Sequence, residues 1–158
     1  RELWTTLGTA ASTTMSDLFD ATGSSSISGF ATLNGDLAYF SQGLDGLAIL
    51  QLREDGSSAN VTTLKSSTAT WALLTNSLYV VDNTIYFMRY RVSGEKRLQL
   101  WKSDGTQAGT ELVRTINGDY SISRYAKVGN MLYMVLINSD AGQFELWRSN
   151  GSTTGTIN

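Results

Sequence analysis

Arginine and aromatic side chains are the residues of this chain best suited to bind a ligand. Arg89, Tyr90 and Arg91 are consecutive, and Tyr120 and Arg124 lie close together further along. Both residue types are favoured at recognition surfaces. Trp71 has no counterpart in the sequence repeats described below, and we expect it at an exposed loop. A solvated rim that binds nothing is the alternative interpretation. The predicted ligand-binding residues are Trp71, Arg89, Tyr90, Arg91, Tyr120 and Arg124.

The composition removes most classes of catalytic site. The 158 residues include no histidine and no cysteine, which excludes thiol chemistry, an imidazole base and zinc sites built from these residues. The acidic residues are scattered through predicted turns, and nothing pairs them as a glycosidase requires. No glycine-rich phosphate loop and no nucleophile elbow occurs in the sequence. We therefore predict that the protein is not an enzyme, with no catalytic residues and no cofactor.

At one position of the repeat, Asp55, Asp104 and Asn150 each lie directly before a turn glycine. Calcium-binding loops also combine aspartate with glycine, but they supply several carboxylates at alternate positions. Each of these turns offers no more than one carboxylate, and no aspartate lies two residues earlier. We therefore expect turns closed by hydrogen bonds from the backbone to this side chain, and no metal site.

The charge of the chain argues against two classes of partner. The net charge is −2, only 16% of the residues are charged, and the sequence pI is about 5.0. Nucleic acids and anionic membranes are bound by basic faces, which this composition does not provide. No run approaches the roughly 18 apolar residues that a membrane span needs. We expect neither a nucleic-acid partner nor membrane insertion.

Internal repeats organise the chain. Turn glycines recur at intervals of 48, 49 and 46 residues, at Gly8, Gly56, Gly105 and Gly151. Two-residue turns followed by an apolar strand keep the same period, at Asn34-Gly35, Asp82-Asn83 and Gly129-Asn130. Two independent markers with one period indicate a repeat protein. The chain, 1–158, is therefore interpreted as a single repeat domain, with repeats over 1–49, 50–97 and 98–143 and a partial repeat over 144–158.

Each period contains four strand candidates, which predicts an all-β fold. In the second repeat and the start of the third they are Leu78–Val81, Ile85–Arg89, Leu98–Lys102 and Glu111–Ile116. Four antiparallel strands in about 47 residues are typical of a β-propeller blade. We predict about three and a third such blades, forming a partial or oligomer-completed propeller. A β-solenoid is the alternative, although its coils are usually shorter, at roughly 20–30 residues.

Trp4, Trp101 and Trp147 recur at one position of the repeat. Aromatic faces stack on sugars, but a large apolar residue in the middle of a repeated strand is better explained by packing between blades. Adjacent apolar residues, such as Leu100 and Trp101, indicate strands that are buried on both faces. We therefore expect the three tryptophans to be core residues.

The tryptophan begins a recognisable motif that ends on a glycine and a threonine. Trp101–Thr110 match the motif of the ELWxxDGT repeat proteins fully, and Trp147–Thr156 match it with asparagine in place of aspartate. Trp4–Thr9 match in outline only, and Gln51–Ser57 have Arg53 where the tryptophan is expected. The chain thus resembles this family of large, mostly bacterial secreted or surface proteins. The resemblance implies a propeller-like fold and export, and it carries over no catalytic residues.

These observations predict a non-enzymatic structural, adhesive or protein-interaction propeller segment of an exported cell-surface protein. A glycan-binding propeller lectin is the alternative, and a carbohydrate-active enzyme is a more distant one. Propeller rings usually have four to eight blades, so three repeats do not close one. We therefore expect the chain to associate with copies of itself or with other parts of a longer chain. Glycans or surface proteins are the further partners that we expect.

Overall fold

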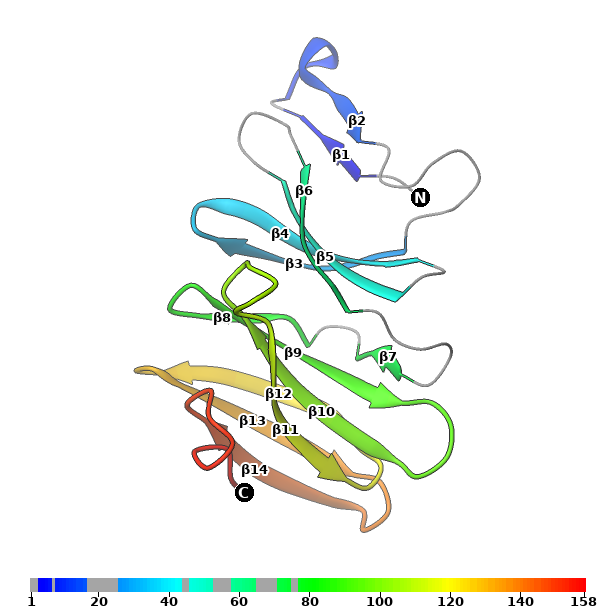
Figure 1. Ribbon diagram of the computed structural model, residues 1–158, viewed down its shortest axis with the longest axis vertical. Helices are drawn as coiled ribbons and strands as arrows, with labels where there is room; N and C mark the ends of the chain where they lie inside the picture. Colours follow the sequence, from blue (N-terminus) through cyan, green and yellow to red (C-terminus); the bar gives the residue numbers. More distant parts are fainter. Residues whose placement is uncertain are drawn as a thin grey trace.

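The protein is folded into antiparallel β-sheets. The computed structural model describes residues 3–6, 8–16, 26–43, 46–52, 58–64, 71–74 and 77–158 (Figure 1). Every strand pair within these residues is antiparallel. The one helical element among them is a single 3-10 turn, η1 (Ala10–Ser12). The prediction of an all-β fold is therefore confirmed.

Four sheets follow one another along the chain. The N-terminal hairpin consists of β1 (Leu3–Thr5) and β2 (Thr14–Ser16). The first sheet has the order β3 (Ser26–Leu33), β4 (Asp36–Gly43), β5 (Gly46–Leu52) and β6 (Ser58–Leu64). The middle sheet has the order β11 (Glu111–Asn117), β10 (Arg97–Ser103), β9 (Thr84–Arg91) and β7 (Trp71–Leu73), with β8 (Tyr79–Val81) also paired to β9. The third sheet has the order β12 (Tyr120–Val128), β13 (Met131–Asn138) and β14 (Gln143–Ser149).

Tight turns join β3 to β4 and β8 to β9, as the sequence predicts. Asn34 and Gly35 have φ of 53° and 88°, and Asp82 and Asn83 have φ of 46° and 58°. Asparagine, aspartate and glycine tolerate this left-handed region better than other residues, and turns of this kind match the twist of a hairpin. These turns fix the register of the hairpins, in which Leu33 pairs with Asp36 and Val81 with Thr84.

The strand that opens each sheet is interrupted at one repeated position. The register shifts around Gly29 in β3 and around Ser123 in β12. The equivalent residue of the middle sheet is Ser77, 48 residues after the first position and 46 before the last. The Ser77 hydroxyl accepts a hydrogen bond from the Met88 backbone N–H at 2.9 Å, in place of a backbone carbonyl. The interruption is wide enough here to divide the strand into β7 and β8.

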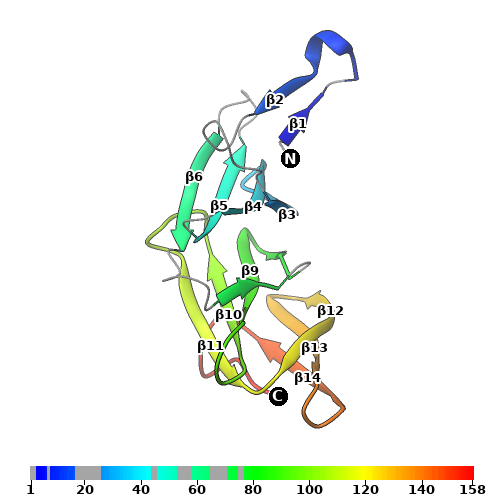
Figure 2. The same cartoon turned by 90° about the vertical axis from the view of Figure 1, so that its right-hand side faces the viewer.

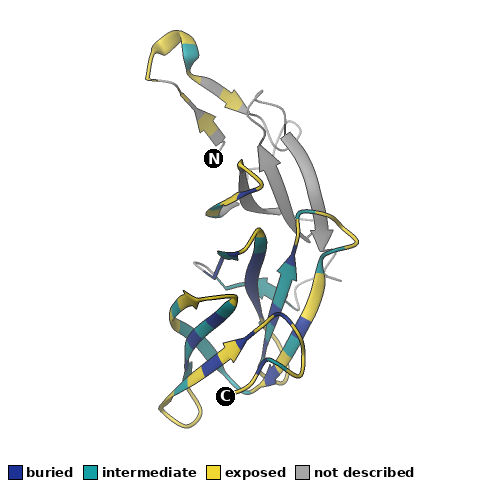
Figure 3. Ribbon diagram, turned by 90° about the vertical axis from the view of Figure 1, so that its left-hand side faces the viewer, coloured by how far each residue is buried: buried dark blue, intermediate teal, exposed yellow. Residues whose placement is uncertain are grey.

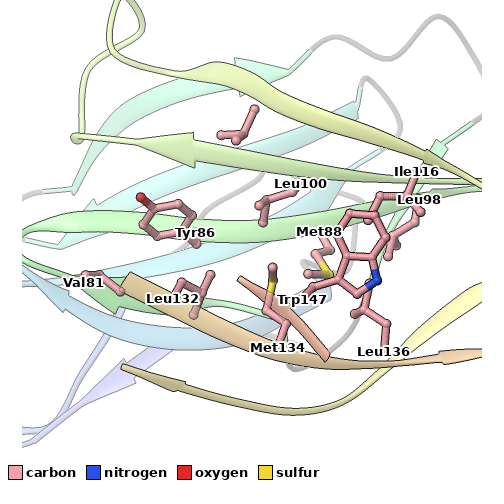
Figure 4. Packing of buried hydrophobic residues seen from close by; sticks show 11 residues of the cluster. Val81, Tyr86, Met88, Leu98, Leu100, Ile116, Leu132, Met134, Leu136 and Trp147 are labelled. Atoms are coloured by element: carbon pink, nitrogen blue, oxygen red, sulfur yellow. The ribbon is translucent and has the colours of Figure 1, made fainter. Parts of the chain in front are cut away.

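The sheets are arranged in chain order along an arc, from the N-terminal hairpin to the third sheet (Figure 2). The larger hydrophobic core joins the middle and third sheets (Figure 4). Its buried residues are Val81, Tyr86, Met88, Leu98, Leu100, Val113, Ile116, Leu132, Met134, Leu136 and Trp147. The smaller core joins the first and middle sheets, and its buried residues are Leu33, Leu78, Ile85 and Phe87.

Strand β9 contributes to both cores, because alternate side chains of a strand point to opposite faces. Tyr86 and Met88 belong to the larger core, whereas Ile85 and Phe87 belong to the smaller one. Burial on both faces explains the continuous apolar run of this strand. It also places Arg89 on the face of the middle sheet that is turned toward the first sheet.

Sheet boundaries differ from the boundaries of the predicted sequence repeats. The repeat over 98–143 contains β11 and all but the first residue of β10 from the middle sheet, together with β12 and β13 of the third. Each repeat of the sequence therefore spans two neighbouring sheets. The segment that carries the motif, from β10 to β11, is followed directly by β12 and so connects the middle sheet to the third sheet.

Candidate functional site

The motif loop after β10 is closed by its own side chains. Oδ1 of Asp104 accepts hydrogen bonds from the backbone N–H of Thr106 at 2.9 Å and from its hydroxyl at 2.8 Å. The Thr106 hydroxyl oxygen accepts a bond from the Gly109 N–H at 2.9 Å, and the Thr110 hydroxyl donates to the Thr106 carbonyl at 2.6 Å. These hydrogen bonds from Thr106 lower the pKa of Asp104. The spacing of the motif is thus accounted for by loop closure.

The loop after β14 has the same set of bonds. Oδ1 of Asn150 accepts from the Ser152 N–H at 3.0 Å and from its hydroxyl at 2.7 Å. The Gly155 N–H donates to the Ser152 hydroxyl oxygen at 3.0 Å. Within the described residues no group of histidine, cysteine, aspartate and glutamate side chains is arranged to hold a metal ion. The turn at Asp55 lies outside the described residues.

Three of the predicted ligand-binding residues meet on the face of the middle sheet that is turned toward the first sheet. The guanidinium carbon of Arg89 lies over the ring of Trp71, 6.0 Å from its centroid. The same carbon lies 5.9 Å from the ring centroid of Trp101. Arg91 pairs with Trp71 across the β7–β9 ladder, and Leu73 pairs with Arg89. The sequence predicted Trp71, Arg89 and Arg91 as ligand-binding residues without predicting that they meet.

The Arg89 guanidinium is buried and incompletely hydrogen-bonded. Arg89 is 5% exposed, and the Nε and Nη2 atoms of its guanidinium have no hydrogen-bond partner in the described part of the chain. Nε of Arg91 is likewise buried and without a partner there. The residue opposite Arg89 on β10 is Gln99, but its Oε1 accepts a bond from the Trp101 indole at 3.0 Å. Burial of the guanidinium lowers the pKa of Arg89.

This arrangement has one chemical capability, which is to donate hydrogen bonds to an electron-rich group. A buried, unpaired guanidinium is costly because it has lost its water. The two indole rings offset part of this cost, since their faces are negative and attract a cation. Among the described residues no carboxylate lies within ion-pair distance of Arg89 or Arg91. We name Trp71, Arg89, Arg91, Gln99 and Trp101 the arginine–indole site.

The other predicted ligand-binding residues lie elsewhere. Tyr90 is on β9 but points to the opposite face, and it is 37% exposed. Tyr120 and Arg124 are on β12 of the third sheet. The Tyr120 hydroxyl donates to Oε1 of Glu145 at 3.0 Å, and Arg124 is an exposed residue opposite Val135. The structure therefore brings together three of the six predicted residues and separates the other three from them.

Two expectations about tryptophan were wrong. Trp71 is a half-buried residue of β7 and not an exposed loop residue, because its strand pairs with β9. Trp4 was expected in the core, but its side chain is 62% exposed and belongs to neither core cluster of the described residues. Trp147 is buried as predicted, at 8% exposed. Trp101 is half-buried, with its ring stacked on Phe87 at 6.2 Å between centroids.

Sequence reasoning missed the participation of Gln99 and Trp101 in the site. A signal was present, because residues two apart on a strand share a face. Gln99 and Trp101 are two apart, as are Glu145 and Trp147 in the next repeat, where the Trp147 indole donates to Oε2 of Glu145 at 2.9 Å. The side chain two before the tryptophan therefore anchors the indole in both repeats.

A depression with a volume of about 300 Å³ lies at the ends of strands β9, β10 and β11, beside the motif loops. Its lining includes Lys102, Asp104 and Glu111. Lys102 donates to the Gly151 carbonyl at 2.9 Å and forms an ion pair of 2.9 Å with Glu111. Because these charges are already engaged, this depression offers a weaker site than the buried guanidinium.

Comparison of the chain with protein-family models, with curated proteins and with solved structures finds no match. Within the described residues no helix has the length and apolar character needed to cross a membrane.

Proposed function

We propose that the chain is a non-enzymatic interaction segment of an exported cell-surface protein, built from sheets that act as β-propeller-type blades. The resemblance of its motifs to the ELWxxDGT repeat proteins supports export and the propeller arrangement. The observation that carries the proposal is a face of the third sheet that repeats a buried face of the middle sheet. A sheet with such a face is suited to pack against a further sheet of the same kind.

The two faces correspond residue by residue. Leu98 and Leu100 of β10 are 0% and 1% exposed, because the third sheet covers them. The residues 46 positions later are Phe144 and Leu146 of β14, which are 71% and 61% exposed. Exposed stretches of the chain are yellow in Figure 3 and include parts of the strands near the C-terminus. Large exposed apolar patches on soluble proteins mark sites of association. We infer that this end face, defined by Phe144 and Leu146, packs against another copy of the chain or another part of a longer one.

The mass of the purified chain in solution tests this proposal. Light scattering over a range of concentrations should show association of the unmodified chain. The double variant Phe144→Lys/Leu146→Lys should be monomeric, because two desolvated ammonium groups oppose packing. The matched control is Val92→Lys, which alters an exposed apolar residue away from the end face. A folded, dilution-stable monomer that binds no hydrophobic dye would contradict the proposal.

Glycan binding is the second candidate function, and the arginine–indole site favours it. Buried unpaired donors beside aromatic rings are typical of sites that fix the orientation of a polar ligand. Screening the fluorescently labelled chain against immobilised neutral and acidic glycans tests this function. Binding to any glycan that Arg89→Leu abolishes would support it. Failure to bind every glycan at high density would eliminate it and leave the interaction segment unaffected.

A further inference from the structure

Arg89 occupies a position that the repeat does not require to be charged. The residue 47 positions later is Leu136, which is 0% exposed and belongs to the larger core. A leucine therefore fills this position of the fold and leaves no unpaired donor behind. Arg89 replaces it at a cost, since a buried guanidinium without partners is unfavourable. The packing of the described residues therefore leaves this buried charge without an internal partner.

The two unpartnered nitrogens of Arg89 define the shape of the acceptor. Nε and Nη2 lie along one edge of the planar guanidinium, and their N–H bonds point the same way. Two parallel donors of this kind match the two oxygens of a carboxylate, which they bind in a bidentate manner. The rings of Trp71 and Trp101 lie over the guanidinium. A planar carboxylate matches this edge better than a tetrahedral anion, because both of its oxygens lie in the plane of the guanidinium.

We propose that the arginine–indole site binds the carboxylate of an acidic sugar, such as a uronic acid. The proposal rests on the glycan-binding candidate function and names the class of its ligand. Arg91 favours a sugar acid over an acid that has no hydroxyl groups, because its buried Nε is a third donor without a partner among the described residues. Arg89 and Arg91 are two residues apart on one face, or about 7 Å along the strand. A sugar acid carries hydroxyl oxygens close to its carboxylate, and these reach the third donor.

The ligand reaches the site along the edge of the middle sheet. Strand β7, which carries Trp71, has three residues and pairs only with β9. Its register pairs are Trp71 with Arg91, Ala72 with Tyr90 and Leu73 with Arg89. A short edge strand separates locally at a small fraction of the global unfolding free energy. Displacement of β7 moves the Trp71 indole away from the Arg89 guanidinium, which gives the ligand access to the site and changes the fluorescence of that indole.

Titration of the full chain with glucuronate, monitored by tryptophan fluorescence, tests the proposal. We expect a saturable change with glucuronate, and little or none with glucose, acetate or inorganic phosphate. Arg89→Lys keeps the charge but removes the two-donor edge, so it should weaken binding by roughly tenfold or more. The matched control, Arg124→Lys, changes an exposed arginine of the third sheet and should leave the titration unchanged.

Two further variants guard against misfolding as an explanation. Arg89→Leu places the leucine of the third sheet at this position, and it should raise the melting temperature while it abolishes the glucuronate response. Gln99→Glu supplies a carboxylate opposite Arg89 from within the chain. Glutamate is the natural residue at the equivalent position of the third sheet, where Glu145 lies opposite Leu136. This variant should also be more stable and should no longer respond to glucuronate. Each retains its circular dichroism spectrum if the expectation is correct.

The outcomes separate this proposal from the function beneath it. Equal responses to glucose and glucuronate would contradict recognition of a carboxylate, although glycan binding would still be supported. Tighter binding of a peptide that ends in glutamate than of glucuronate would contradict the proposal that the ligand is a sugar. Absence of any saturable response in the folded unmodified chain would overturn the site, and the association of the chain in solution would remain a separate question.

Discussion

Two layers of packing join the three larger sheets, and each receives a tryptophan from the same position of the repeat. In the layer between the middle and third sheets, Trp147 is 8% exposed within a cluster of apolar side chains. In the layer between the first and middle sheets, Trp101 is half-buried and shares its surroundings with the guanidinium of Arg89. One layer is an ordinary hydrophobic core, and the other contains a polar site.

The difference between the layers originates in the strand beside the tryptophan. Leu136 lies near Trp147 in the first case and Arg89 near Trp101 in the second, at equivalent positions of the repeat. The side chain that anchors the indole differs too, since Glu145 replaces Gln99. The strands and turns of the repeat are thus the same in both layers, although Arg89 replaces the leucine and Gln99 the glutamate of the third sheet. These two differences give the middle sheet a hydrogen-bond donor where the third sheet has a core residue. The third tryptophan, Trp4, has the same local sequence role but remains 62% exposed.

Removal of the tryptophan side chains should give the largest effect on stability. Trp147→Ala should lower the free energy of unfolding by about 3–5 kcal/mol, because it leaves a cavity in the larger core. Trp4→Ala should change it by less than about 0.5 kcal/mol, because most of that side chain already lies in solvent. Urea unfolding of both variants measures the difference. Equal losses would show that the two positions are equivalent after all.

Alanine at the turn glycines should give the next largest effect. Gly151 and Gly8 have φ of 82° and 91°, so alanine at either residue is strained by roughly 1–2 kcal/mol. A Cβ at Gly151 would lie 2.5 Å from the Tyr86 hydroxyl, whereas a Cβ at Gly8 would meet nothing within 4 Å. Gly151→Ala should therefore be the more destabilising by about 1 kcal/mol or more. Thermal unfolding of the two variants, with no difference between them, would refute this close approach between sheets.

The pH dependence of stability should distinguish the two anchors of the indoles. Hydrogen bonds from Asn138 and then Trp147 lower the pKa of Glu145. A group with a lowered pKa stabilises the fold above its unfolded pKa, near 4.3, and loses this contribution as the pH falls through the folded value. Glu145→Gln should therefore lose less stability than the unmodified chain between about pH 5 and pH 3. Parallel acid unfolding curves would contradict the assignment.

Exchange of the loop side chains should give the smallest effect. Asp104→Asn reproduces Asn150, whose Oδ1 accepts the equivalent two bonds. The free energy of unfolding at pH 7 should change by less than about 0.5 kcal/mol. Calcium should leave the melting temperature of both proteins unchanged, because the loop has one carboxylate and is closed by its own bonds. A calcium-dependent rise that Asp104→Asn removes would establish the metal site that we consider absent.

Local structure was predictable from the sequence because it depends on neighbouring residues. The two-residue turns at Asn34-Gly35 and Asp82-Asn83 have the predicted positive φ, which these residue types favour by sterics alone. Strands β9, β10 and β11 include the predicted ranges Ile85–Arg89, Leu98–Lys102 and Glu111–Ile116. The loop closed by Asp104 was also predicted, since its bonds join residues only two to four apart.

Tertiary structure decided which residues of equal local role become core, site or surface. Trp4, Trp101 and Trp147 occupy one repeat position, yet their exposure depends on the sheet that lies opposite. Trp71 and Arg89 are separated by 18 residues and meet only because β7 pairs with β9. Sequence periodicity determines which face of a strand a side chain takes, because the period is local. It does not determine what covers that face, because the covering residues come from distant segments whose packing is settled only when the sheets assemble.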